Sequence, residues 1–318
     1  MNNSISSRLR LAAGFSYTLV TSTGLALYVV VCLALMRYWS QLRNPFYKLI
    51  THLAVSDCGY ALSNIFLMIP LTLAGRALYS EPVLNAFGAV HSFFANSIFA
   101  HCFLLTLQRF CYFLSPNWNG RLFEGAANKW TAVVAWICVL AVVTQIHLCK
   151  CFIYFNHTSL HYHYRCFPES NFVYLLPMFF VQMVVPPLCM CMYLAIYLHI
   201  RKQRGNAGAP DQNRRYRTET KLLLQGLIIG VFLFSVVLLF LFVPAHTYWG
   251  PPLLSFWSTI NAAFNPFLYL IFNSILRRKV CLMLHIRTAT VGPSTNQRNV
   301  YQKRSGINGA GGPFPGPN

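Results

Sequence analysis

Seven long apolar runs dominate this chain of 318 residues and limit what it can fold into. A bilayer core about 30 Å thick needs roughly 20 mainly apolar residues per helical crossing, and each run meets that length. Barrel strands do not fit, because they need alternating polarity and these runs are apolar on every face. The sequence therefore predicts an all-α membrane protein, a bundle of seven transmembrane helices. The runs cover residues 11–36, 49–74, 86–114, 130–148, 172–200, 222–243 and 253–276.

The charged residues are few and mostly basic. They make up only 10% of the chain, with 25 Lys and Arg against 6 Asp and Glu, and the formal net charge is +19. Such an excess suits either nucleic acid or an anionic membrane surface. Five of the basic residues fall on the amino-terminal side of the runs and 20 on the opposite side. The charge therefore reports orientation in a bilayer, and nucleic acid is excluded as a partner.

The positive-inside rule predicts a multi-pass plasma-membrane protein with its amino terminus outside the cell and its carboxyl terminus in the cytoplasm. Two sequons, at Asn2 and Asn156, both fall on the outer side and are expected glycosylation sites. The expected organisation is an outer tail over 1–10, the bundle over 11–276 and a juxtamembrane amphipathic helix over 277–287. The Ser-, Thr-, Gly- and Pro-rich segment 288–318 is expected to be a disordered cytoplasmic tail.

Ionisable groups within a bilayer cost several kcal/mol and are functional candidates by default. Asp57 is the one carboxylate inside the runs, where it serves either as a structural hydrogen-bond hub or as a switch or cation site. Arg109 ends the third run and either snorkels into the headgroups or takes part in a switch. The seventh run contains Asn265-Pro266-Phe267-Leu268-Tyr269, and its proline and neighbouring amide predict a polar kink that can act as a hinge.

On these residues the chain resembles the rhodopsin-like (class A) G-protein-coupled receptors over about residues 11 to 285. The resemblance rests on the Asn-Pro-x-x-Tyr motif of the seventh run, the Leu-Ala-x-x-Asp of the second and Arg109 at the foot of the third. A short amphipathic eighth helix follows the motif, as in that family.

Within the family the chain looks like the nematode serpentine chemosensory receptors. An Asn-Pro-Phe-Tyr-Lys-Leu stretch, an Arg-Phe pair in place of Arg-Tyr and a Glu-Thr-Lys-Leu-Leu-Leu-Gln segment carry this narrower resemblance. The choice between subfamilies such as Srx, Srt and Srv stays open at this point.

The resemblance implies a receptor that converts binding of an extracellular ligand into activation of a heterotrimeric G protein, with arrestin-like proteins as further partners. The family acid before the arginine is replaced by Gln108, so Glu219 is the expected partner of Arg109 in an inactive-state clamp. The expected switch residues are Asp57, Arg109, Glu219, Asn261, Asn265, Pro266 and Tyr269.

The ligand is expected to be small and not a monoamine, although a peptide is an alternative. Amine receptors of the family carry a carboxylate where this chain has His91. Depth in the bundle alone selects five pocket candidates, and ordinary helix packing is the alternative explanation for each of them. They are His91, Phe94, Asn96, Gln182 and Trp257.

The family disulfide lacks its cysteine on the third helix, where this chain has Leu84. Any disulfide is therefore expected within the second outer loop, which offers Cys149, Cys151 and Cys166. Cys281 follows a basic cluster and is either a palmitoylation site or a plain interfacial cysteine. No metal and no cofactor are expected, because the histidines of the outer loop offer no closed tetrahedral shell.

Other classes of membrane protein fit less well. A retinal photoreceptor needs a lysine deep in the seventh helix, and no lysine occurs between Lys221 and Lys279. A seven-helix transporter or channel is the alternative function, but coupled transporters need more intramembrane acids than one. An enzyme is not expected, because the runs contain no pair of carboxylates and no His/Asp motif at one depth.

Overall fold

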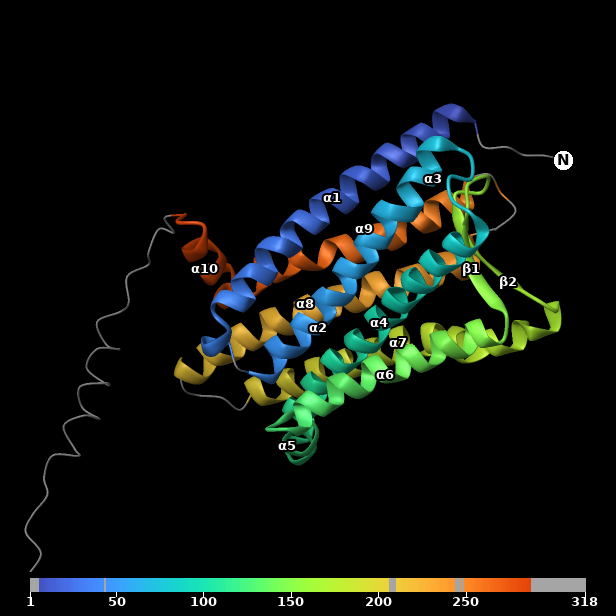
Figure 1. Ribbon diagram of the computed structural model, residues 1–318. Helices are drawn as coiled ribbons and strands as arrows, with labels where there is room; N and C mark the ends of the chain where they lie inside the picture. The colour runs from blue at the N-terminus through green and yellow to red at the C-terminus, as the bar shows by residue number, and fades with distance from the viewer. Residues whose placement is uncertain (1–5, 43, 206–209, 244–246, 248, 287–318) are drawn as a thin grey trace, which may run out of the picture.

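The computed structural model describes residues 6–286 apart from 43, 206–209, 244–246 and 248 (Figure 1). Within this part, long helices lie side by side in one bundle (Figure 1). Six helical segments are long and apolar enough to cross a membrane, and the α9–α10 pair, bent by 93°, makes up to seven. The predicted seven-helix membrane bundle is confirmed. Its long helices are α1 (Ser7–Arg37), α2 (Pro45–Ser63), α4 (Glu81–Leu114), α6 (Ala127–Leu148), α7 (Leu176–Gly205), α8 (Pro210–Phe242) and α9 (Gly250–Phe272).

The helices at the two ends of the bundle differ in extent from the predicted runs. α1 begins at Ser7, where Ser6 accepts a hydrogen bond from the Leu9 amide. α9 ends at Phe272, because the Asn273 side chain accepts a hydrogen bond from the Leu276 amide at 3.0 Å and starts a new helix. That helix, α10 (Ser274–Met283), is the predicted amphipathic segment, shifted from 277–287. The tail 288–318 lies outside the described residues.

The second helix changes its winding part-way along. A π-helical turn, η2 (Asn64–Met68), joins α2 to α3 (Ile69–Ala74). Pro70 has no amide hydrogen, so it cannot donate to the Phe66 carbonyl one turn earlier. The Tyr79 hydroxyl donates to that carbonyl instead, at 2.9 Å. The Phe66 carbonyl in this irregular turn therefore has a hydrogen-bond donor.

A two-stranded antiparallel hairpin covers one end of the bundle, and the sequence analysis did not predict it. Strand β1 (Cys151–Asn156) pairs with β2 (His161–Cys166). We call this end the hairpin end; α10 and α5 (Pro116–Phe123) lie at the opposite end, the α10 end (Figure 1). Phe155 and Leu160 are buried in a cluster with residues of α1, η2 and α3. A Cβ on Gly88 of α4 would lie 1.8 Å from the Ile153 carbonyl oxygen, so only glycine permits this approach.

The hairpin is closed by a disulfide between Cys151 and Cys166. This confirms a disulfide within the predicted loop and leaves Cys149 as a free thiol.

Removing this disulfide is expected to loosen the hairpin. In the chain-entropy model, a cross-link across about 15 residues contributes about 3 kcal/mol. The double variant Cys151→Ala/Cys166→Ala should therefore raise the hydrogen-exchange rate of β1 and β2 amides roughly 100-fold. Cys149→Ala is the matched control and should leave those rates unchanged. Equal protection in the double variant would show that packing alone holds the hairpin.

Candidate functional site

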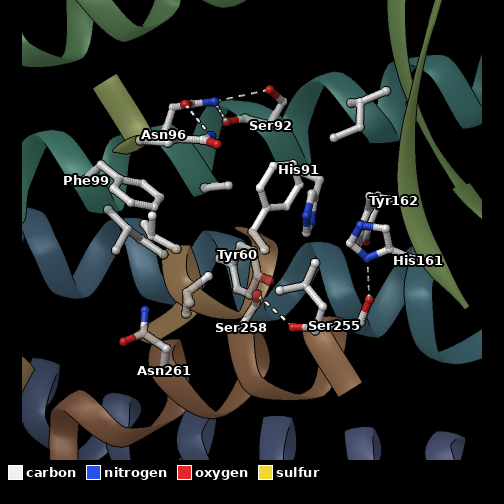
Figure 2. A pocket seen from close by; sticks show the side chains of 18 of the residues that line it. Tyr60, His91, Ser92, Asn96, Phe99, His161, Tyr162, Ser255, Ser258 and Asn261 are labelled. Carbon is white, nitrogen blue, oxygen red and sulfur yellow. Dashed lines mark hydrogen bonds between the residues drawn. The ribbon is translucent and has the colours of Figure 1, made fainter. Parts of the chain in front are cut away.

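A cavity of about 210 Å³ lies beneath the hairpin, between α2, α4, α7, α8 and α9 (Figure 2). This volume is below the roughly 300–1,000 Å³ of sites for drug-sized ligands. Among the described residues that line it, none is Asp, Glu, Lys or Arg. Most of the wall is aromatic or aliphatic. The polar groups gather on two sides of the cavity.

The first polar side joins α4 to α7. The Asn96 amide donates to the Ser92 carbonyl at 2.8 Å, and it lies 3.3 Å from the Ser92 hydroxyl. Gln182 of α7 donates to the Asn96 side-chain oxygen at 3.1 Å. Figure 2 shows the bonds between Asn96 and Ser92 at the cavity wall. This row of amides and hydroxyls can exchange hydrogen bonds with a ligand.

The second polar side belongs to α9 and the hairpin. The His161 Nδ1 atom lies 3.0 Å from the Ser255 hydroxyl oxygen (Figure 2). Burial, followed by the neighbouring His163, lowers the pKa of His161 to about 4, so its imidazole is neutral at pH 7. Deeper in the cavity, the buried Asn261 Oδ1 has no hydrogen-bond partner among the described residues. An unpartnered acceptor at this depth is suited to a ligand donor or a water molecule.

His91 anchors the hairpin over the cavity. Its ring stacks on Tyr162 of β2 with centroids 3.7 Å apart, and its Nδ1 atom lies 3.0 Å from the Ser63 hydroxyl. The Tyr162 hydroxyl in turn donates to Asn64 of η2 at 3.4 Å. His91 therefore joins the wall of the cavity to its roof.

The structure places three of the five pocket candidates at the cavity and two away from it. His91, Asn96 and Gln182 line the cavity. Phe94 packs against α2, where a Cβ on Gly59 would lie 2.3 Å from its ring. Trp257 donates to the Ser235 hydroxyl of α8 at 2.7 Å and stacks on Phe232, so it lies between two helices.

Other lining residues escaped the sequence analysis. Tyr60, His161 and Tyr162 line the cavity. No pattern in the sequence separates the two hairpin residues from their neighbours, because only the strand pairing brings them over α4 and α9.

A buried polar network lies further from the hairpin and centres on Asp57, which is fully buried. Asn265 of α9 donates to the Asp57 carboxyl at 2.9 Å, and the Tyr28 hydroxyl of α1 donates to the same carboxyl. The Tyr28 hydroxyl also lies 3.0 Å from the Ala262 carbonyl. The network therefore joins α1, α2 and α9.

Tyr28 is a residue of this network that the sequence did not predict. Tyr28 lies one turn beyond Gly24, and it supplies the hydrogen bonds to both helices. A Cβ on Gly24 would lie 2.6 Å from the Ala263 Cβ, so the glycine lets α1 approach α9.

The remaining switch residues lie toward the α10 end. The Arg109 guanidinium lies 3.7 Å from the centroid of the Phe46 ring, and Arg109 is only 9% exposed, so it does not snorkel. Gln108 donates to Asn119 of α5 at 3.5 Å. Tyr269 is fully buried, and its hydroxyl has no hydrogen-bond partner among the described residues. The Glu219 side chain lies outside the described part of the chain, so the clamp stays a prediction.

The predicted modification sites also stay predictions. Asn156 lies at the hairpin turn, where its side-chain oxygen accepts bonds from the Thr158 amide at 2.9 Å and the Thr158 hydroxyl at 2.7 Å. Cys281 is a half-buried free thiol on α10. Asn2 lies outside the described residues.

The membrane-spanning bundle, the roofed cavity and the polar network beneath it define a seven-helix receptor of the rhodopsin type. The family model of the serpentine type 7TM GPCR chemoreceptors Srx matches residues 18–273, and the chain belongs to this family. The expected resemblance is confirmed and narrowed to one of the subfamilies considered. Family and fold are those of a receptor and not of an enzyme.

The fold is also similar to that of squid rhodopsin. The crystal structure of that protein aligns with a TM-score of 0.74 and 14% sequence identity, over 98% of this chain and 94% of the other. Similarity at this identity shows the fold alone. No curated protein matches the chain.

Proposed function

We propose that this chain is a plasma-membrane chemoreceptor that binds a small, uncharged, non-monoamine ligand and activates a heterotrimeric G protein. The hairpin end faces outward and the α10 end faces the cytoplasm. The observation that carries the ligand class is the cavity, whose described lining contains no Asp, Glu, Lys or Arg. A buried ammonium group would have no counter-ion there, and an unpaired buried charge is costly. Family membership supports coupling to a G protein.

The orientation is supported by two independent features of the sequence. Twenty of the 25 basic residues fall on the α10 side of the runs. The sequon at Asn156 lies in the hairpin, where an outward-facing loop would meet the glycosylation machinery. Arrestin-like proteins and lipid headgroups are the further partners that this arrangement supports at the α10 end.

The signal travels along α9. Asn261 borders the cavity, and Asn265, one turn further along, donates to Asp57. Pro266 follows Asn265 inside the helix and has no amide hydrogen to donate to the Ala262 carbonyl, so α9 can bend at this point. A ligand that contacts Asn261 would bind the receptor more tightly when α9 is bent in one way than when it is bent in another. Such a ligand would shift the population of receptor states. The rearranged α9 then releases Arg109 to the G protein.

A panel of paired compounds tests this function. Cells that express the chain with a promiscuous G protein should give a calcium response to uncharged alcohols or ketones and not to the matched primary amines. Gln182→Leu should weaken the response about tenfold, because a hydrogen bond to a ligand is worth about 1.5 kcal/mol. Phe94→Leu, which changes a ring outside the cavity, is the control.

A response confined to amines would contradict the ligand class. The receptor role has a separate readout, the nucleotide exchange of a G protein mixed with the chain in nanodiscs. If none of the compounds accelerates nucleotide exchange, the result contradicts the receptor role and favours a transporter or channel.

A further inference from the structure

The hairpin closes the cavity at its own end. Ile153, His161, Tyr162 and Tyr164 all line the cavity from the hairpin. The contact of the Ile153 carbonyl with Gly88 and the stack of Tyr162 on His91 hold this roof against α4. The His161 contact with Ser255 holds it against α9. The described part of the hairpin end is therefore covered by a cross-linked element that is bonded to two helices.

The wall between α7 and α8 has a different character. It consists of Phe179 and Met183 from α7 and of Val236, Val237 and Phe240 from α8. Each of these side chains is apolar, so no hydrogen bond links them. Phe179 and Phe240 lie ring to ring with centroids 6.3 Å apart. This wall is held by packing between side chains that can rotate.

Phe240 belongs to the cavity and to the outer surface of the bundle at once. It lines the cavity, yet 48% of its surface is exposed. Phe180 and Leu241, which follow Phe179 and Phe240 in the sequence, are 66% and 59% exposed. Apolar surface of this kind on a membrane-spanning helix faces lipid. Phe240 therefore lies at the boundary between the cavity and the bilayer.

The backbone of α7 is weakened beside this wall. Pro186 and Pro187 lie inside the helix and have no amide hydrogen. In a regular helix these two residues would donate to the carbonyls of Gln182 and Met183, which both line the cavity. Two consecutive hydrogen bonds are thus absent next to Phe179. The segment of α7 toward the hairpin can lean away from α8 without breaking further backbone hydrogen bonds at this point.

We propose that ligands reach this cavity sideways from the bilayer, between α7 and α8, with the Phe240 ring as the gate. The ligand class follows from this route. It is a small, uncharged molecule that partitions into the lipid and carries one or two hydrogen-bonding groups for the Asn96 and Ser255 sides of the cavity. The route deepens the proposed function, but its test does not depend on signalling.

The test uses a cysteine placed in the cavity and two thiol reagents that differ only in charge. Ser258 lines the cavity on α9, and its hydroxyl bonds only within its own helix, to the Leu254 carbonyl at 2.9 Å, so Ser258→Cys is a mild change. Intact cells are treated with 3,3-dimethylbutyl methanethiosulfonate or with its permanently charged isostere, 2-(trimethylammonio)ethyl methanethiosulfonate. The extent of modification at position 258 is measured by peptide mass spectrometry. Ser170→Cys, at an exposed residue of the short 3-10 helix Glu169–Leu175, reports that both reagents reach the protein.

The uncharged reagent is expected to modify Ser258→Cys at least tenfold faster than the charged one, relative to their rates at Ser170→Cys. Adding Phe240→Trp should slow the uncharged reagent several-fold, and Phe240→Ala should accelerate it. Phe242→Trp is the matched control, because Phe242 is 77% exposed on the same helix end and does not line the cavity. Phe240→Leu, which keeps the apolar surface, should give an intermediate rate.

Three results would overturn the lateral route. The charged reagent could modify Ser258→Cys as fast as Ser170→Cys, which would mean that it reaches the cavity from water. The uncharged reagent could fail to modify Ser258→Cys at all. The Phe240 variants could leave the rate of modification by the uncharged reagent unchanged while Cys151→Ala/Cys166→Ala raises that rate. This result would place the opening at the hairpin. In each case the receptor function is tested separately, by the nucleotide-exchange measurement.

Discussion

Replacing Arg109 with alanine is expected to abolish G-protein activation while leaving surface expression intact. Arg109 lies in the part of α4 nearest the α10 end, and its guanidinium lies 3.7 Å from the centroid of the Phe46 ring. A desolvated contact of this kind is worth about 2 kcal/mol. That energy alone shifts a two-state equilibrium about 30-fold. In the proposed mechanism Arg109 is also the group that meets the G protein, so its loss should remove the response itself. The readout is agonist-stimulated nucleotide exchange, normalised to receptor at the cell surface.

Arg121 provides the matched control for this change. Its guanidinium lies 5.6 Å from the centroid of the Trp118 ring, but Arg121 is on α5 and Trp118 is 55% exposed. Arg121→Ala should therefore leave signalling close to the unmodified level. Tyr269→Phe removes only a buried hydroxyl and tests the other end of the proposed switch. Normal signalling in both Arg109→Ala and Tyr269→Phe would refute the mechanism.

The fold could be predicted from the sequence because membrane helices follow from local composition. Each crossing needs a long apolar run, and such runs are visible without knowledge of their neighbours. The hairpin could not be predicted in the same way. In the segment Cys-Phe-Ile-Tyr-Phe-Asn of β1, all but the last residue are hydrophobic, whereas their burial alternates in the structure. The alternation arises because one face of the strand packs on the bundle, with Ile153 on Gly88 and Phe155 in a cluster with α1, η2 and α3. This packing cannot be seen in the local sequence pattern.

The site was partly predicted for a related reason. Depth along a helix can be counted from the sequence, and it correctly placed His91, Asn96 and Gln182 at the level of the cavity. The direction in which a side chain points around the helix axis cannot be counted in the same way, because packing against the neighbouring helices sets it. Phe94 turns toward Gly59 and Trp257 turns toward Ser235, so both lie at the right depth but on the wrong face.

The last prediction concerns Tyr28, whose hydroxyl joins the Asp57 carboxyl to α9. Tyr28→Phe leaves the ring in place and removes one donor from a fully buried site. We expect a loss of about 1–3 kcal/mol in the free energy of unfolding, because a buried acceptor then loses its partner. Asp57→Ala should cost at least as much, since both Tyr28 and Asn265 then lose their acceptor. Thermal unfolding in detergent measures both changes.

The pairing of these residues is best tested as a double-mutant cycle with an internal control. If Tyr28 acts through Asp57, Tyr28→Phe should cost almost nothing once Asp57→Ala is present, giving a coupling of at least about 1 kcal/mol. Tyr17 is the control, because it is also a buried tyrosine of α1 whose hydroxyl reaches α9, at the Pro252 carbonyl 2.9 Å away. Tyr17→Phe should add to Asp57→Ala without coupling. Equal coupling for both tyrosines would mean that Asp57→Ala loosens α1 as a whole. A coupling confined to Tyr28 instead identifies its hydroxyl as the group that joins α1 to Asp57.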